Sequence, residues 1–232
     1  MSEKSSKRCE TYSESKSTIF HNFYKTITLN ARKEFFNLFV LNTKYSENKS
    51  VIDIGTTPSL EEEQNIFLEK TKNNTNITCL SNQDCQILFK KYKNIKKIII
   101  GDGRNTKIEN NSFDIVHSNA TIEHVGSLDN QLSFVKEMLR ISKEVVFIQT
   151  PNRYYPLDFH TILPFIHWLP KNIHRNILKF LKLDFYSKEE NINLLSLNDL
   201  KNICKILNIK NYKIIKYKLF FFTSNLILII HK

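Results

Sequence analysis

Short runs of β-branched and other apolar residues alternate with stretches of helical periodicity along most of this chain. The runs are SVIDIG at 50–55, ITCL at 77–80, KKIIIG at 96–101, SFDIVHS at 112–118 and EVVFIQT at 144–150. Helical patterns lie between most of them, around 60–70, at 85–92 and at 128–142. Short continuous apolar runs are typical of strands buried on both faces, and their alternation with helices calls for a parallel sheet. The sequence therefore predicts an α/β protein with helices on both faces of the sheet.

The two ends of the patterned region extend this prediction. From Ser17 to about Leu41, apolar residues recur at helical spacing, which indicates one or two amphipathic helices before the first strand. A capped helix is expected at 196–208, with Ser196 as the N-cap and Asp199 three residues later. The last segment, 212–232, predicts two strands joined by a turn near Ser224 and Asn225.

Four of the five prolines fall between residues 151 and 170, in the stretch PNRYYPLDFHTILPFIHWLP. This proline-punctuated, aromatic stretch follows a strand end and is not expected to belong to the sheet. We therefore predict a polar, disordered tail over 1–16 and one domain over 17–232, with 151–185 as a lid or acceptor-side insertion. No internal repeat is visible.

The first residues are polar and rich in serine, without the apolar core of a signal peptide. The longest apolar run, LFFFTSNLILII at 219–230, is shorter than the roughly 20 residues that a bilayer requires. A cytoplasmic protein is therefore expected. Cys9, Cys79, Cys85 and Cys204 lack metal-ligand spacing and are interpreted as reduced, structural thiols.

Glycine is rare, with four residues in 232, and each one lies at or just after the carboxyl end of a predicted strand. They are Gly55, Gly101, Gly103 and Gly126. Ligands of open parallel sheets bind at that edge, near the point where the strand order reverses. Glycine there indicates backbone with positive φ or backbone that passes close to a ligand, although ordinary turns also attract glycine.

Two aspartates share this edge, Asp53 at the end of the first strand and Asp102 at the end of the third. A carboxylate can accept hydrogen bonds from an adenine amine, a ribose hydroxyl or a cationic group. Paired beside glycines at two strand ends, these residues indicate a ligand site and not two isolated turns.

Four segments, in this order, resemble the successive motifs of class I S-adenosylmethionine-dependent methyltransferases of the type 11-like group. They are VIDIG at 51–55, IIGDG at 99–103, SFDIVHSNATIEHV at 112–125 and VVFIQTP at 145–151. The proline-rich segment is similar to a bacterial subgroup associated with cell-surface polysaccharide biosynthesis. The resemblance implies a Rossmann-like, seven-stranded, mostly parallel sheet with an antiparallel last strand.

The resemblance also implies S-adenosylmethionine as the cofactor. Asp53, Gly55 and Thr56 would then lie along its methionine part, and Asp102 would accept a hydrogen bond from the adenine amine. Gly101 and Gly103 would let the backbone lie against the purine. The positions expected to line the rest of the cofactor pocket are Ser81, Ser118, Asn119 and Ala120.

Two positions depart from the pattern of the resembled family. Thr57 and Ser59 stand where further glycines are expected in the first loop. Ser81 stands where the second strand normally ends in an acid, and Asp84 is a candidate replacement. These departures keep an alternative open, which is a module of the same fold that binds the cofactor weakly or without turnover.

The predicted reaction is methyl transfer to a small-molecule or carbohydrate-linked acceptor, at oxygen. Donor and acceptor must be held in line, and a hydroxyl acceptor must lose its proton. His124 and His160 are the candidate catalytic bases. A nucleic-acid acceptor is disfavoured because SNAT replaces the Asn-Pro-Pro-aromatic signature after the fourth strand. A dinucleotide-dependent dehydrogenase is disfavoured because no GxGxxG follows the first strand.

Positive charge is concentrated in the last quarter of the chain, which carries most of the net charge of +11. On a helical wheel, four basic residues of the expected lid helix face away from most of its apolar residues, and only Leu178 falls among them. They are Lys171, Arg175, Lys179 and Lys182. The pattern is typical of a helix that covers an anionic ligand or lies on a membrane, and also of a packed helix with solvated lysines. We predict an anionic or lipid-linked glycan acceptor, with a peripheral contact to the inner face of the membrane.

Overall fold

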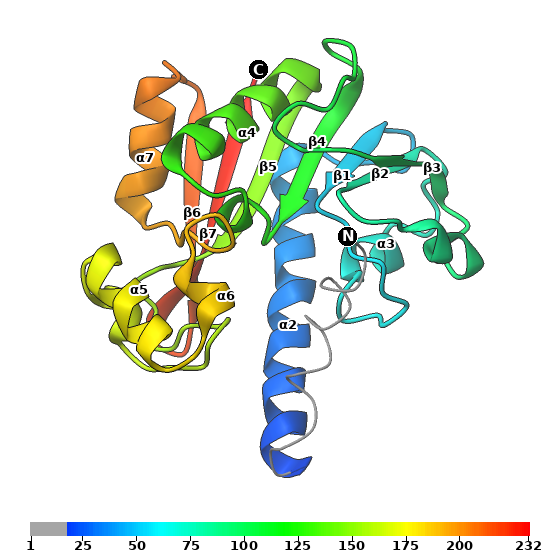
Figure 1. Ribbon diagram of the computed structural model, residues 1–232. Helices are drawn as coiled ribbons and strands as arrows, with labels where there is room; N and C mark the ends of the chain where they lie inside the picture. The colour runs from blue at the N-terminus through cyan, green and yellow to red at the C-terminus, as the bar shows by residue number, and fades with distance from the viewer. Residues whose placement is uncertain (1–17) are drawn as a thin grey trace.

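The computed structural model describes residues 18–232, with side chains from residue 26 onward. Seven strands form one sheet in the order β3-β2-β1-β4-β5-β7-β6 (Figure 1). The strands are β1 Val51–Ile54, β2 Ile77–Ser81, β3 Ile95–Ile100, β4 Phe113–Asn119, β5 Ser142–Pro151, β6 Tyr212–Leu219 and β7 Phe222–His231. The first five pair in parallel, and β7 runs antiparallel to both β5 and β6. The predicted mostly parallel, seven-stranded sheet is confirmed.

Helices cover both faces of the sheet, as the apolar runs predicted (Figure 1). On one face lie α2 Thr18–Thr43, a single long helix, and α3 Ile66–Lys70. Phe39 of α2 and Phe67 of α3 pack with Phe147 of β5 in the core on that face. On the other face lie α4 Leu128–Ile141 and α7 Leu197–Ile206, whose apolar residues share a second core with β1, β4, β5 and β7.

The expected helix caps are present. The Ser196 side chain accepts a hydrogen bond from the Asp199 backbone, and the Asp199 carboxylate accepts one from the Ser196 backbone. This reciprocal capping box confirms the predicted start of α7. At α4, Ser127 plays the same part by accepting a hydrogen bond from the Asn130 backbone.

The helical elements near β2 and β3 are shorter than the sequence predicts. The stretch expected around 60–70 is helical only from Ile66, and residues 85–92 contain a 3-10 helix, η1 Gln86–Lys90. Leu88 is the one buried residue of η1, so this segment lacks the apolar stripe that holds an α-helix against a sheet. Between β3 and β4 the described chain has no helix, and residues 101–112 form a loop.

The position of the last hairpin turn corrects the sequence prediction. The turn lies at Phe220 and Phe221, with Phe220 at φ 56°, and not at Ser224 and Asn225. Ser224 and Asn225 are buried within β7, where the Ser224 hydroxyl donates to the Tyr217 carbonyl at 3.4 Å and Asn225 pairs with Pro151 of β5. Polar residues that commonly form turns are used here inside a strand.

The segment after β5, for which a lid or insertion was predicted, lies at one end of the sheet (Figure 1). It contains η3 Ile166–Trp168, α5 Lys171–Phe180 and α6 Asp184–Ser187. Leu178, the apolar residue that breaks the basic stripe of α5, is the buried residue of that helix. The side of α5 that faces the protein is therefore the side that carries part of the basic stripe, and several of its apolar residues face solvent.

Among residues 18–232, no helix is long and apolar enough to cross a membrane. Cys79, Cys85 and Cys204 are free, buried thiols, as expected, and burial raises the pKa of Cys204 to about 11. The predicted tail at 1–16 and Cys9 lie outside the described residues.

Glu137 on α4 fastens the loop that replaces a helix between β3 and β4. Its carboxylate accepts hydrogen bonds from the Thr106 backbone and hydroxyl, at 2.7 and 2.6 Å, and from Arg140 at 2.8 Å. The hydrogen bond from Arg140, with those from Thr106, outweighs the effect of burial and lowers the pKa of Glu137 to about 2. This carboxylate therefore remains ionised in the folded protein well below the pH at which it protonates in the unfolded chain.

We expect Glu137→Gln to lower the free energy of unfolding by roughly 1–3 kcal/mol near pH 7. Because the pKa in the folded state lies below the ordinary glutamate value of 4.5, the contribution is complete above that value and is lost as the pH falls toward 2. Urea unfolding near pH 7 and near pH 3 measures the difference, with Glu109→Gln on the same loop as the control. An equal deficit at both pH values would contradict the assignment.

Candidate active site

The loops that follow β1 and β4 meet at the carboxyl edge of the sheet, where the strand order reverses between these two strands. Gly55, with φ 96°, ends β1, and a Cβ atom at this position would overlap the side chain of Thr121. The Thr121 hydroxyl donates to the carbonyl of Ile54 at 3.3 Å. Glycine is therefore required here both by its backbone conformation and by the close approach of the β4 loop.

Asp53 is buried beneath this junction. One carboxylate oxygen lies 2.6 Å from Nδ1 of His117 on β4, and the other accepts a hydrogen bond from the Thr56 hydroxyl at 2.8 Å. His117 stacks on Phe67, with ring centroids 4.2 Å apart. Both predicted residues, Asp53 and Thr56, are thus brought together, and their side chains fix the start of the first loop from below.

The first loop runs from Thr56 to Asn65 before α3 begins, and it carries Thr57 and Ser59 where the resemblance predicts glycines. Asn65 holds this loop in place. Its side-chain amide donates to the carbonyls of Thr57 at 3.1 Å and Ser59 at 2.6 Å. A buried asparagine therefore ties the end of the loop to its first half.

Ser81 ends β2 and is buried, with its hydroxyl accepting a hydrogen bond from the Gln83 backbone at 3.2 Å. The suggested replacement acid, Asp84, is exposed and accepts a hydrogen bond from the backbone of Gln86 at the start of η1. The structure therefore places both residues at the end of β2 and gives each one a local hydrogen bond.

Asp102 lies in the loop after β3 and is gripped by Arg104, a residue that the sequence analysis did not single out. The guanidinium Nε donates to both carboxylate oxygens, at 3.0 and 2.9 Å, and the Arg104 backbone donates at 2.8 Å. These hydrogen bonds outweigh partial burial and lower the pKa of Asp102. The carboxylate is held ionised, and the spacing Asp-x-Arg was the signal for this pair.

The two glycines beside Asp102 serve different needs. A Cβ atom on Gly103 would collide with Phe134 of α4 and Ile54 of β1, so this glycine lets the loop pack on the core. Gly101 has open space at the corresponding position. Close approach to a ligand remains a prediction at Gly101, whereas packing alone accounts for Gly103.

Ser118, Asn119 and Ala120 end β4 and begin its loop. The buried Ser118 hydroxyl donates to the Ile54 carbonyl at 2.9 Å and ties β4 to β1. Ala120 has φ 51°, a left-handed conformation that is uncommon outside glycine and is typical of constrained functional loops. The Asn119 amide oxygen is buried and has no hydrogen-bond partner among the described residues. This oxygen is suited to accept a hydrogen bond from a ligand.

The two predicted catalytic histidines meet, although 36 residues separate them in sequence. Nε2 of His124, in the 3-10 helix η2 Ile122–His124, lies 3.3 Å from Nε2 of His160 in the insertion. Nδ1 of His124 lies 2.7 Å from the carbonyl oxygen of Asn191. Nδ1 of His160 lies 3.2 Å from the Asp158 carboxylate. The structure thus joins the β4 loop and the insertion through one imidazole pair.

Two carboxylates flank this pair, and the sequence analysis identified neither. Glu123 is fully buried, accepts a hydrogen bond from Thr150 at 2.9 Å, and lies 4.0 Å from Nε2 of His124. Burial acts to raise the pKa of Asp158, but interactions with His160 and Thr161 outweigh it and lower the pKa to about 2. The motif EH at 123–124 was the signal for Glu123, whereas Asp158 required the folded insertion.

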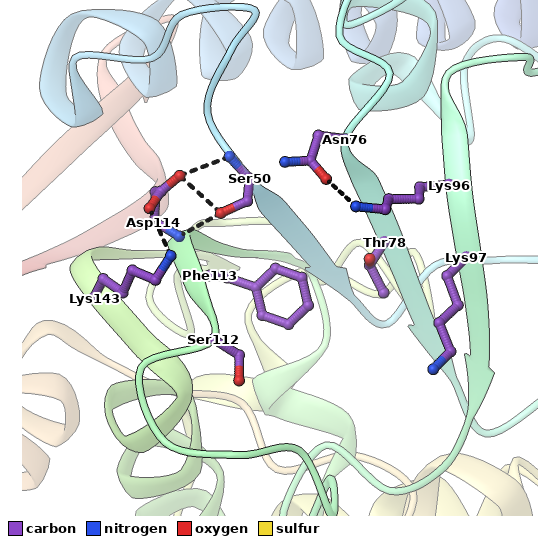
Figure 2. A pocket seen from close by; sticks show the side chains of 9 residues that line it. All are labelled: Ser50, Asn76, Thr78, Lys96, Lys97, Ser112, Phe113, Asp114 and Lys143. Carbon is purple, nitrogen blue, oxygen red and sulfur yellow. Dashed lines mark hydrogen bonds and ion pairs between the residues drawn. The ribbon is translucent and has the colours of Figure 1, made fainter.

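A hollow of about 600 Å³ lies at the opposite, amino edge of the sheet and does not belong to this site (Figure 2). Asp114 accepts a hydrogen bond from the Ser50 backbone at 2.8 Å and pairs with Lys143 at 3.2 Å. The hollow is lined by Ser50, Asn76, Thr78, Lys96, Lys97, Ser112, Phe113, Asp114 and Lys143. A second hollow continues from it along β3 and the loop 105–109, over sheet that no helix covers.

The comparisons with known proteins point to one class of protein, the methyltransferases. Residues 65–147 match the family model described as a methyltransferase domain, beginning just after the unusual first loop. The sheet order, which reverses between β1 and β4, is that of the class I methyltransferase fold, in which ligands bind in the crevice outside the carboxyl ends of the strands. No protein in the curated set matches the sequence.

Solved structures share this fold across nearly the whole chain. A SAM-dependent methyltransferase from Archaeoglobus fulgidus aligns at 13% identity and a TM-score of 0.57, covering 92% of this chain and 99% of its own. One from Aquifex aeolicus aligns at 12% identity and a TM-score of 0.54, covering 88% and 91%. PigF with SAH aligns at 13% identity and a TM-score of 0.56, covering 93% and 67%. With the family match, they support a class I methyltransferase with S-adenosylmethionine as its cofactor.

The residues at the crevice fit this cofactor. The buried Asn119 oxygen offers an acceptor for its ammonium group beside the left-handed backbone of Gly55. The ionised Asp102 offers an acceptor for the adenine amine at the end of β3. Polar acceptors thus lie at the ends of β4 and β3, two of the strand ends where the resemblance predicts cofactor-binding residues.

We expect Asp102→Ala to weaken cofactor binding by roughly 1–3 kcal/mol, the scale of a lost hydrogen bond to a charged group. Arg104→Ala is the matched control, because it removes the same ion pair and leaves the carboxylate available to adenine. Its affinity for S-adenosylmethionine should equal or exceed that of the wild type in calorimetric titration. An unchanged dissociation constant in Asp102→Ala would remove the adenine assignment.

Proposed function

We propose that this protein transfers a methyl group from S-adenosylmethionine to a hydroxyl group of a small-molecule or carbohydrate-linked acceptor. The imidazole pair of His124 and His160 carries this proposal, because it lies between the loop after β4 and the insertion at the carboxyl edge of the sheet. A hydroxyl acceptor needs a base at the reacting end of the cofactor, and an imidazole is well suited to that task near neutral pH.

When bound, S-adenosylmethionine supplies an already activated methyl group. The protein must then orient the acceptor and remove its proton. Nδ1 of His124 lies against a carbonyl oxygen, which can only accept, so Nδ1 carries the proton and Nε2 is the basic nitrogen. The acceptor proton moves to Nε2 of His124 or His160. Glu123 and Asp158 stabilise the resulting imidazolium.

We place the acceptor under the insertion at 151–185, in the role of a lid. Tyr154, Phe165 and Trp168 expose aromatic surface in this segment, and the rings of Phe165 and Trp168 are in edge contact, with centroids 5.0 Å apart. Arg153 donates to the carbonyls of His167 and Leu169 and supports η3. Exposed aromatic rings beside basic residues suit a sugar ring with a negatively charged or lipid-linked group, in keeping with surface polysaccharide biosynthesis.

The proposal is tested by incubating the protein with labelled S-adenosylmethionine and candidate glycans, and measuring both S-adenosylhomocysteine and the methylated product. Binding of S-adenosylmethionine without turnover on any acceptor would favour the alternative, a cofactor-binding module of the same fold. The irregular first loop, with Thr57 and Ser59 in place of glycines, is the observation that keeps this alternative under test. Absence of cofactor binding would contradict both functions.

We also propose that the lid lies on the inner face of the membrane of a cytoplasmic enzyme. Apolar side chains project from α5 and from the β6–β7 turn, including Phe180, 85% exposed, and Phe221, 90% exposed. Asn152 donates to the Thr223 carbonyl, and its neighbour Arg153 donates into η3, so the turn and the lid adjoin the same two residues. Exposed apolar groups with nearby lysines are typical of interfacial surfaces.

Only part of the basic stripe of the lid is exposed on the surface. Lys171 donates to the Asn193 side chain at 2.6 Å, and Arg175 pairs with Glu189 at 3.2 Å, so both are engaged within the protein. Lys179 and Lys182 are exposed. The stripe that can meet an anionic lipid is therefore reduced to its second half.

We expect Lys179→Ala/Lys182→Ala to weaken binding to anionic vesicles by about 2 kcal/mol, since a lysine near such a surface contributes about 1 kcal/mol. Phe180→Ser/Phe221→Ser should weaken binding through lost apolar burial. Lys201→Ala/Lys205→Ala on α7 is the charge-matched control and should bind like the wild type. Co-sedimentation with vesicles of phosphatidylglycerol measures all four proteins. Equal binding by all of them would remove the membrane contact.

A further inference from the structure

The contacts of the His124 and His160 rings determine which nitrogen of each ring carries the proton. Nδ1 of His124 lies against a backbone carbonyl oxygen, and Nδ1 of His160 lies against a carboxylate oxygen of Asp158. Both oxygens are acceptors, so both Nδ1 atoms carry protons. In the neutral rings both Nε2 atoms then present lone pairs, and they do so toward each other across 3.3 Å. Two lone pairs at this distance repel unless a positive charge lies between them. The arrangement calls for a proton or a metal ion.

The spacing of the two nitrogens matches metal coordination. Zinc binds imidazole nitrogen at about 2.0–2.1 Å with tetrahedral geometry, which sets two nitrogen ligands about 3.3–3.4 Å apart. The observed separation is 3.3 Å. The ligand atoms of His124, His160 and Glu123 all lie within 4.8 Å of one another. The Glu123 oxygen is 4.0 Å from Nε2 of His124 and is the third ligand atom of the set.

The surroundings of these side chains also resemble those of metal ligands. Histidines that bind metals commonly donate their other ring N–H to a carboxylate or a backbone carbonyl, which fixes the tautomer and the ring orientation. His160 and His124 show these two arrangements, one each. The second oxygen of Glu123 accepts a hydrogen bond from Thr150, which orients the carboxylate.

We propose that Glu123, His124 and His160 form a binding site for one divalent transition-metal ion of the zinc class. Two imidazoles and one carboxylate suit zinc and similar borderline ions, whereas Mg²⁺ and Ca²⁺ prefer all-oxygen ligands. Three protein ligands leave a fourth position, as in catalytic zinc sites, and that position would be open to water or an acceptor hydroxyl.

Binding of the ion does not depend on methyl transfer, while any use of it in catalysis rests on the function proposed above. An ion at the Nε2 pair and a proton-accepting Nε2 are alternative states of the same atoms. With the ion bound, an acceptor hydroxyl at the fourth position would have a lowered pKa and would lose its proton to solvent water and not to an imidazole. The protonated pair is the competing state in the absence of the ion.

Titration of the full-length, chelator-treated protein with Co²⁺ tests the site, since the visible absorption of Co²⁺ reports four-coordinate geometry. Calorimetry with Zn²⁺ gives the stoichiometry and the affinity. We expect one ion per chain. His124→Ala and His160→Ala should each weaken binding by at least about 100-fold, because loss of an outer-shell partner alone costs about 10–100-fold. Asp158→Asn should show that smaller loss.

His231→Ala, at the exposed end of β7, is the control and should bind the ion like the wild type. Circular dichroism checks that each variant is folded, and the wild-type stoichiometry tests the site even if a variant is not. Absence of saturable binding by the wild type, or equal binding by the His124→Ala/His160→Ala protein, would overturn the proposal. S-adenosylmethionine titrated into the same samples separates the two proposals. Cofactor binding without ion binding defeats the metal site alone, and ion binding without cofactor binding defeats the proposed methyltransferase function alone.

Discussion

Replacing His124 with alanine should lower the turnover number by about 10²–10⁴-fold, the usual contribution of a positioned general acid or base. The dissociation constant for S-adenosylmethionine should change by less than about threefold, because a general base acts mainly on the proton of the acceptor. His160→Ala should lower turnover as well, since its ring and the Asp158 carboxylate stabilise the charge that develops on the pair. Single-turnover rates at saturating acceptor measure the effect.

A control variant and a pH profile test the role of His124 further. His231→Ala removes an exposed histidine at the far end of β7 and should keep full turnover. The pH profile should also change, because a general base must be unprotonated to act, so the wild-type rate should fall on the acidic side and that of His124→Ala should not. If neither His124→Ala nor His160→Ala slows the reaction by more than about threefold, catalysis rests on positioning alone.

The fold was predictable from sequence because its cause is local. Runs such as VIDI and ITCL are apolar on both sides, and only strands covered on both faces bury them completely. The same logic located α4 and the capping box of α7. The prediction was wrong at the last turn. Ser224 and Asn225 are residue types that are common in turns, but here they are buried within the sheet. The exposed turn is formed by Phe220 and Phe221.

The site was predictable only in part, because its decisive contacts join distant segments. The sequence proposed His124 and His160 separately, but nothing local indicates that they face each other. Their approach depends on how the insertion folds back, with Leu178 buried and the Asp158 carboxylate holding the imidazole of His160. Glu123 was missed because a buried acid beside a histidine looks, in sequence, like any exposed helical acid.

The glycines near the expected cofactor site are required for different reasons. At Gly55 the left-handed backbone and the contact with Thr121 both exclude a side chain, and this residue lies where the cofactor is expected. At Gly103 the reason is packing against Phe134 and Ile54. The glycines beside Asp102 therefore do not by themselves identify a purine site. The ionised carboxylate held by Arg104 is the stronger argument.

The start of the first loop is held by the buried pair of Asp53 and His117. Loss of this pair should have the largest effect on the free energy of unfolding. Asp53→Ala leaves the Nδ1 atom of His117 buried without its partner and removes the acceptor of the Thr56 hydroxyl. Breaking a buried pair by removing one partner costs about 3–5 kcal/mol. We expect a loss of about 3 kcal/mol in the free energy of unfolding, with a fall in Tm of about 6–12 °C for a chain of this size.

A double-mutant cycle separates this pair from simple loss of volume. His117 is surrounded by the rings of Phe39, Phe67 and Phe147, so Asp53→Ala/His117→Phe replaces both polar partners and puts an aromatic ring among aromatic rings. The double variant should recover most of the stability that Asp53→Ala loses, because no polar group of the pair then stays buried without a partner. Additive losses in the cycle, measured by urea unfolding near pH 7, would show that Asp53 and His117 do not stabilise each other. In that case the first loop would have to be held by Asn65 alone.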